Sequence, residues 1–187
     1  LKRIINSYNS LIPDRFNQIV MVSSYINNYD TIRLQLSLKQ LPFLYPPFKE
    51  PITKNISDST RSGITCNMAS NGFESILFDQ ITKNIPINYL EGYKETKQTT
   101  LELYPKNPKV IFTANAHDSN DNFKFWSAYY SDQDIKLIGA QHGGHYGTGL
   151  WASADDHELK IFDKYFTWGW RSNKYKNIIP IPSVQLS

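Results

Sequence analysis

The chain has 187 residues, of which 40% are hydrophobic and 14% aromatic, and this content suffices for a folded core and excludes an intrinsically disordered protein. The net charge of +3 comes from lysines and arginines scattered among acidic residues, so the sequence lacks the dense basic stripe of a nucleic-acid-binding surface and we expect no nucleic-acid partner. The single Cys66 excludes an internal disulfide and a Cys-x-x-Cys metal site, and no apolar stretch is long enough to span a bilayer.

The first 70 residues give few strong signals. Ile4, Ile5, Tyr8 and Leu11 recur at helical spacing and predict a helix that is followed by other short elements. Four prolines in Leu41–Pro51 exclude a regular helix there and predict a loop that carries aromatic side chains. Because the chain begins without an initiating methionine, we interpret it as part of a longer protein.

Helical patterns return after residue 70. Asn71 can cap a helix that has Glu74 three positions later, and this helix is expected to end near Asn84 because Pro86 disfavours helical geometry before it. A second, mostly polar helical stretch is predicted over residues 89–104. The apolar side chains that share one face of the first helix are Phe73, Ile76, Leu77 and Ile81.

The clearest architectural signal is a β-α-β unit. Lys109–Ala114 and Ile135–Ala140 are short apolar runs typical of buried strands, and Asp118 can cap a helix between them. Parallel strands joined by a helix take the right-handed crossover almost without exception. We therefore predict an α/β fold with a parallel sheet. The apolar positions of the connecting helix include Phe123, Trp126 and Tyr130.

The histidines are concentrated near these strands. Three of the four fall in Gln141–His157, and the fourth is His117. Histidine is the side chain best suited to proton transfer near neutral pH. His117 and His142 closely follow the two predicted strands, whose carboxyl ends meet at the edge of the sheet where ligands bind in open α/β folds. We expect both to lie on this edge and predict them as catalytic residues.

Five of the nine glycines lie between residues 139 and 149. Glycine lets the backbone approach a ligand closely, and successive amide N–H groups form anion-binding concavities. The segment matches neither the dinucleotide fingerprint nor the P-loop, so we predict a phosphate-binding loop of another kind. The alternative for His142 and His145 is a pair of polar loop residues bonded to backbone carbonyls. The predicted substrate or phosphate contacts are Gln141, Gly143, Gly144, His145, Tyr146, Gly147 and Glu158.

Two other functions compete with this interpretation. The four histidines would allow a zinc site and a metal-dependent hydrolase, but there is no His-Glu-x-x-His motif and no cysteine partner, so we predict no metal. The other alternative is a non-catalytic carbohydrate-binding or assembly module. Exposed aromatic side chains, such as those of Leu41–Pro51, would then stack on sugar rings.

Several separated blocks resemble, in the same order, a family of bacterial transferases of surface-carbohydrate biosynthesis, and the resemblance covers about residues 71–182. More distantly, Gln141-His142-Gly143 is similar to the Gln-x-Trp-His-Gly element of teichoic-acid glycerophosphotransferases, whose histidine acts as the base. Capsular Kdo and nonulosonate transferases are a neighbouring comparison. The blocks are Tyr89–Tyr93, Ile111–Asn115, Phe123–Trp126, Gln141–Gly147, Asp156–Glu158 and Asp163–Trp170.

The resemblance implies a GT-B-like enzyme, in which two Rossmann-like halves face each other across a cleft that holds a nucleotide-activated donor. Residues 1–167 would belong to the amino-terminal half, and residues 168–187 to the crossover or the start of a second domain. The implied donor is a nucleotide sugar, CMP-linked if the sugar is of the Kdo or nonulosonate type, and the implied acceptor is a glycan or lipid-linked glycan. No further cofactor is expected. The resemblance and the lack of a signal peptide imply a cytoplasmic location, at the inner face of the membrane.

Together these inferences predict an inverting, metal-independent glycosyl transfer. His142 would accept the proton of the acceptor hydroxyl. The amides of Gly143 and Gly144 and the ring of His145 would steady phosphate or developing negative charge. His117 would orient His142 or bind substrate.

Overall fold

The computed structural model describes residues 2–44, 55–64, 72–149 and 153–183. The chain forms two compact units, which we call the sheet unit (Leu1–Pro47 with Thr100–Ser187) and the helical unit (Phe48–Thr99). Within the described ranges, no helix combines the length and apolar character needed to cross a membrane. Asn71 and most of the Leu41–Pro51 segment lie outside the described residues.

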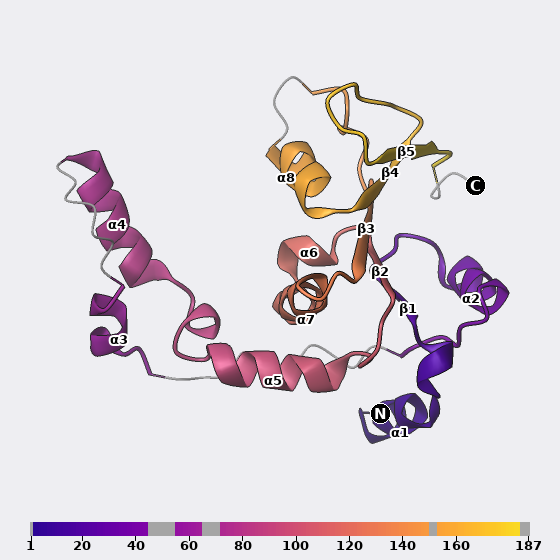
Figure 1. Ribbon diagram of the computed structural model, residues 1–187, viewed down its shortest axis with the longest axis horizontal. Coiled ribbons are helices and arrows are strands. Elements are labelled where there is room, and N and C mark those ends of the chain that lie inside the picture. The colour runs from indigo at the N-terminus through magenta and orange to yellow at the C-terminus, as the bar shows by residue number, and fades with distance from the viewer. Residues whose placement is uncertain (1, 45–54, 65–71, 150–152, 184–187) are drawn as a thin grey trace. The chain divides into compact units, whose positions relative to one another are not determined.

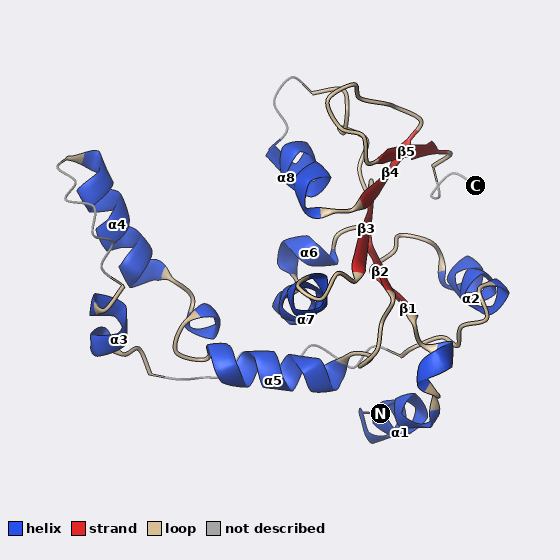
Figure 2. Cartoon of the chain, in the orientation of Figure 1, coloured by secondary structure: helices blue, strands red, loops and turns tan. Residues whose placement is uncertain are grey.

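Five parallel strands form a single sheet in the sheet unit, and their spatial order follows the chain order β1-β2-β3-β4-β5 (Figure 2). This confirms the predicted α/β class with a Rossmann-like parallel sheet. The segment 168–187, expected near the crossover to a second domain, contributes the last strand to the same sheet. The strands are β1 (Ile19–Val22), β2 (Val110–Thr113), β3 (Lys136–Ala140), β4 (Lys164–Trp168) and β5 (Ile178–Ile181).

The predicted β-α-β unit is present. β2 and β3 pair in parallel, and two consecutive helices connect them, α6 (Ala116–Ser119) and α7 (Asp121–Ser131). The predicted cap is wrong: Asp118 lies inside α6, and Asn120 caps α7 by accepting a hydrogen bond from the Phe123 amide at 3.0 Å. The short α6 thus places its own side chains at the carboxyl end of β2.

One face of the sheet carries the core. Ile111, Leu137 and Tyr165, from the three central strands, pack with Phe123 and Trp126 of α7 in one cluster of buried side chains. Figure 1 shows α6, α7 and α8 (Ser153–Ile161) on the same side of the sheet. The loops that follow the strands are therefore anchored to a closely packed base.

Three further predicted helices are confirmed as α1 (Lys2–Leu11), α4 (Phe73–Asn84) and α5 (Tyr93–Leu103). The sequence patterns gave no prediction of β1, β4 and β5 as strands. The other elements outside the predictions are α2 (Asn28–Ser37), α3 (Asp58–Ser62), α6, α8 and the 3₁₀ turns η1 (Asp14–Phe16) and η2 (Ile87–Tyr89).

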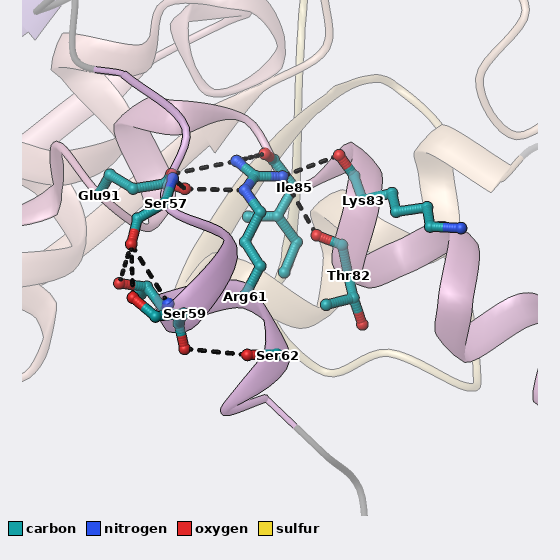
Figure 3. A network of polar contacts seen from close by, with 9 residues as sticks. Ser57, Ser59, Arg61, Ser62, Thr82, Lys83, Ile85 and Glu91 are labelled. Atoms are coloured by element: carbon teal, nitrogen blue, oxygen red, sulfur yellow. Dashed lines mark hydrogen bonds and ion pairs between the residues drawn. The ribbon is translucent and has the colours of Figure 1, made fainter.

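The helical unit is organised around a buried arginine (Figure 3). Arg61 of α3 donates two hydrogen bonds to Glu91, through Nε at 2.7 Å and through Nη2 at 3.0 Å. Its remaining donors reach the carbonyl oxygens of Thr82, Lys83 and Ile85, at 2.8–3.1 Å. These carbonyls at the end of α4 would otherwise lack partners, so Arg61 ends that helix and ties it to α3.

Candidate active site

The loops that follow β1, β2, β3 and β4 bring together side chains at the carboxyl edge of the sheet. Tyr25 comes after β1, and its ring centroid lies 5.7 Å from that of His142, which comes after β3. Asn115, after β2, donates a hydrogen bond to the Tyr25 hydroxyl at 3.1 Å. Ser23 and Tyr25 have φ angles of 48° and 60°, values that side-chain-bearing residues adopt at a cost and that cluster at functional sites.

A fully buried carboxylate, that of Glu158 in α8, lies at the centre of this edge. Tyr146 donates a hydrogen bond to Oε1 at 2.8 Å, and Tyr165 donates one to Oε2. Burial alone would raise the pKa of Glu158, but contacts from His117, Tyr165 and Tyr146 outweigh it and leave the pKa below its ordinary value. Glu158 is therefore ionised at neutral pH, without a lysine or arginine partner among the described residues.

The two tyrosines remain hydrogen-bond donors. Burial, the hydrogen bond to Glu158 and its negative charge raise the pKa of Tyr146 above its ordinary value of 10. The same causes raise the pKa of Tyr165. Both hydroxyls therefore keep their protons at any pH at which the protein would work.

His142 and His117 approach the same oxygen of Glu158 from different loops. Their Nε2 atoms lie 3.5 Å and 3.3 Å from Oε1, respectively. His142 is connected further, because its Nε2 lies 2.6 Å from the Tyr146 hydroxyl. Although they are 25 positions apart in the sequence, the crossover places both histidines at one carboxylate.

His117 is buried, and neither of its ring nitrogens makes a hydrogen bond of good geometry within the described part of the chain. Its Nε2 lies 3.3 Å from Asp118 Oδ1 and from Glu158 Oε1. Ligand atoms of these three residues all lie within 4.8 Å of one another, and one imidazole with two carboxylates can hold a divalent cation. A cation would compete with two tyrosine hydroxyls for the oxygens of Glu158.

Gln141 is buried and fixes the start of the glycine-rich loop. Its Oε1 accepts hydrogen bonds from the Trp168 amide at 2.9 Å and from Trp170 Nε1 at 2.8 Å. Its Nε2 donates to the carbonyl oxygen of Gly143 at 2.6 Å. Gln141 therefore joins the loop after β3 to the end of β4, and every polar atom of its side chain is engaged.

The remaining predicted contact residues differ in whether a ligand could reach them. Gly144 and His145 are exposed, and the centroid of the His145 ring lies 4.3 Å from that of Tyr146, with the rings tilted by 33°. The amide of Gly147 is engaged by Asp155 Oδ2 at 3.0 Å. Gly147 has a φ of +73°, and a Cβ there would meet the Trp170 ring at 2.7 Å, so a side chain cannot be accommodated.

A pocket of about 270 Å³ opens between the glycine-rich loop after β3, the first turn of α8 and the segment after β4. Asp155 lines it, and its Oδ1 atom is buried and has no hydrogen-bond partner within the described residues. Asp156 accepts hydrogen bonds from Lys174 at 3.2 Å and Tyr175 at 2.6 Å. The principal lining side chains are Asp155, Asp156, Trp170, Arg171, Lys174 and Tyr175.

Sequence patterns missed several parts of this site. Tyr25 and Asp118 were not predicted as site residues, and Tyr165 was named only within a block of the family resemblance. Tyr165 packs in the core, and its hydroxyl also holds Glu158. The pocket residues after β4 carry no motif. Only their position after a strand of a parallel sheet could have indicated them.

Comparison with protein families matches the whole chain, residues 1–187, to the family described as LIC12162 family transferase. Searches among curated proteins and among solved structures gave no match. The family assignment therefore rests on the full length of the chain and supports an enzyme that transfers a chemical group. The chain belongs to the LIC12162 family of transferases.

Proposed function

We propose that the chain is part of a glycosyltransferase that moves a sugar from a nucleotide-activated donor to a hydroxyl of a bacterial surface glycan, with inversion and without a metal ion. The observation that carries this proposal is the position of His142. It lies at the carboxyl edge of a parallel sheet, bonded to Tyr146, and a pocket of about 270 Å³ lies beside the same loop. A base next to a small polar pocket is what transfer to a hydroxyl requires.

The reaction balances as one substitution at the anomeric carbon. His142 takes the proton of the acceptor hydroxyl, and the acceptor oxygen forms a bond to that carbon. The bond between the anomeric carbon and the donor phosphate breaks, and the nucleotide leaves with the electron pair. A positioned general base contributes about 10²–10⁴-fold to such a step.

Phosphate stabilisation is assigned to the exposed part of the glycine-rich loop. Gly144 has no atom within 4 Å of a built Cβ, so its backbone is open to close approach by a ligand. We assign its amide, that of Gly143 and the ring of His145 to the leaving phosphate. Gln141 and Gly147 are held in internal hydrogen bonds, and their role is to shape the loop.

The composition of the pocket suits a sugar. The carboxylates of Asp155 and Asp156 are acceptors that suit sugar hydroxyls, and Trp170 and Tyr175 supply aromatic surface. The two aspartates are balanced by Arg171 and Lys174, so the lining carries no net charge. An acidic sugar of the Kdo or nonulosonate type, donated from CMP, would use Arg171 for its carboxylate.

The wider assignment follows the family and the fold. We propose a GT-B-like arrangement, in which a second Rossmann-like half provides much of the donor site. The enzyme would act in the cytoplasm, at the membrane face where lipid-linked acceptors are presented.

Asp155→Asn, which keeps the shape of the pocket and removes a charge, tests the sugar contact.

A screen of nucleotides by thermal shift is the most direct experiment. The full-length protein is heated with CMP, CDP, UDP or GDP, and the nucleotide that raises the melting temperature identifies the donor class. The sugar linked to that nucleotide is then supplied with acceptor glycans, and turnover is measured. No response to any nucleotide would instead favour a non-catalytic carbohydrate-binding module.

A further inference from the structure

We propose that His142 accepts the proton through Nδ1, because Tyr146 and the buried Glu158 hold Nε2 as a hydrogen-bond donor. Tyr146 and Glu158 are then positioning residues that select one tautomer of the catalytic imidazole. Only the catalytic role of His142 rests on the proposed glycosyl transfer. The tautomer itself is a property of the resting protein.

The single proton of the Tyr146 hydroxyl determines the tautomer of His142. A tyrosine hydroxyl has one proton, and that of Tyr146 is donated to Glu158 Oε1 at 2.8 Å. The same hydroxyl lies 2.6 Å from His142 Nε2, so in this second contact its oxygen can only accept. Nε2 must therefore carry a proton. In a neutral imidazole the lone pair that can take another proton is then on Nδ1.

The surroundings of Nε2 support the same assignment. Besides the Tyr146 hydroxyl, two carboxylate oxygens face it, Glu158 Oε1 at 3.5 Å and Asp118 Oδ2 at 3.7 Å. All three groups favour an N–H, and a lone pair at Nε2 would face negative charge. Within the described part of the chain, no hydrogen bond to Nδ1 is found, and 19% of the His142 side chain is exposed.

The arrangement also provides for the charge that forms during reaction. When Nδ1 takes a proton the ring becomes a cation, and the ionised Glu158 lies close enough to stabilise it. Tyr146 carries this interaction, because it bonds to both groups. The role matches that of the aspartate in serine protease triads, which orients a histidine and stabilises its charged form without taking its proton.

Tyr165 supplies a matched control. Tyr146 and Tyr165 each donate one hydrogen bond to Glu158 from a buried position, but only Tyr146 contacts His142 Nε2. Tyr146→Phe and Tyr165→Phe therefore remove the same chemical group from the same carboxylate. A general loss of packing would affect both variants, whereas loss of the positioning contact affects only the first.

The test is NMR of the full-length protein labelled with ¹⁵N in histidine, with His142→Gln used to assign the signals of His142. We expect long-range ¹H–¹⁵N correlations to show the neutral ring protonated on Nε2, with an Nε2–H that exchanges slowly with water. Tyr146→Phe should make that proton exchange rapidly, and Tyr165→Phe should leave it protected. A ring protonated on Nδ1, a ring that never loses its second proton, or equal behaviour of the two variants overturns the proposal.

Turnover gives a second measurement once a donor is known. Tyr146→Phe is expected to lower kcat by about 10–100-fold, the loss typical when a partner that orients a functional histidine is removed, with little change in KM. Tyr165→Phe, which removes a donor from Glu158 but no contact with His142, should lower kcat by a smaller factor than Tyr146→Phe. If the NMR result holds while no nucleotide binds, the tautomer assignment stands and glycosyl transfer falls. If nucleotide binds but the ring is protonated on Nδ1, the positioning proposal alone is overturned.

Discussion

Two buried glutamates, one in each unit, are held in opposite ways. In the helical unit, Glu91 faces the guanidinium of Arg61, whose other donors all end on backbone carbonyls (Figure 3). In the sheet unit, Glu158 has no cation of fixed charge among the described residues and is held by two tyrosine hydroxyls beside two histidines. In the first network, both oxygens of Glu91 and all the nitrogens of the Arg61 guanidinium have partners. In the second network, Tyr146 connects Glu158 to the partly exposed imidazole of His142.

The two carboxyl groups reach a lowered pKa by different routes. The hydrogen bond from Arg61 is the main cause that lowers the pKa of Glu91 to about 2. For Glu158, burial acts in the opposite direction and is outweighed by contacts with His117 and the two tyrosines. An arginine fixes the charge permanently, whereas histidine and tyrosine neighbours can respond when a proton moves. We infer that the Glu91 network serves stability and the Glu158 network serves chemistry.

The largest expected effect tests the chemical side of this comparison. His142→Ala should lower turnover by about 10²–10⁴-fold, because the general base is lost. The melting temperature should change little, since the imidazole is partly exposed. Turnover with the nucleotide sugar identified by the screen measures the first, and calorimetry the second. Near-full turnover in this variant would remove His142 from the mechanism and leave the two glutamates without a functional distinction.

Next comes the stability side. Arg61→Leu should lower the melting temperature of the helical unit by roughly 6–20 °C, because it leaves the charge of Glu91 buried without a partner. Catalytic constants of the folded fraction should persist. Lys83→Leu is the matched control in the same unit, since it breaks an exposed pair with Asp79 of 2.8 Å that contributes little. Similar melting temperatures for the two variants would show that the buried network does not stabilise the unit.

Acid pH provides a smaller effect with a defined sign. The pKa of Glu91 is about 2 in the folded chain against an ordinary value of 4.5, so its stabilising contribution is complete above 4.5. The contribution is lost as the pH falls from 4.5 toward 2, because the unfolded chain binds the proton first. Urea unfolding of the wild type and of Glu91→Gln at a series of pH values measures it. Their difference in stability should shrink across this window, and a difference independent of pH would contradict the assignment.

The sequence predicted the part of the fold whose local pattern is unambiguous. Short apolar runs marked β2 and β3 in the sequence. The handedness of the crossover was then enough to predict that His117 and His142 lie at the same edge of the sheet. β4 was missed because bulky aromatic residues occupy both of its faces: Tyr165 is buried in the core and Phe166 lies on the other side. β5 contains Pro180, which usually argues against a strand and is tolerated here because β5 is at the edge of the sheet.

The centre of the candidate site could not be predicted in the same way. Glu158, in the charged run Asp155–Glu158, was predicted as a substrate or phosphate contact and not as a buried residue. It is buried because α8 turns Glu158 and Leu159 toward the sheet. Its two tyrosine partners lie on different elements, seven and twelve positions away. Such a contact depends on tertiary packing and leaves no spacing that a motif can capture.

The smallest expected effect concerns metal ions at the Glu158 network. Removal of metal with a chelator, or addition of Zn²⁺ or Mn²⁺, should shift the melting temperature by less than about 2 °C, because tyrosine hydroxyls already occupy both oxygens of Glu158. A cation bound at 100 times its dissociation constant would stabilise the fold by about 2.7 kcal/mol. His117→Gln decides how a larger shift is interpreted. A stabilisation by Zn²⁺ that disappears in this variant would identify His117, Asp118 and Glu158 as ligands, and would replace the transferase mechanism proposed here with a metal-dependent one.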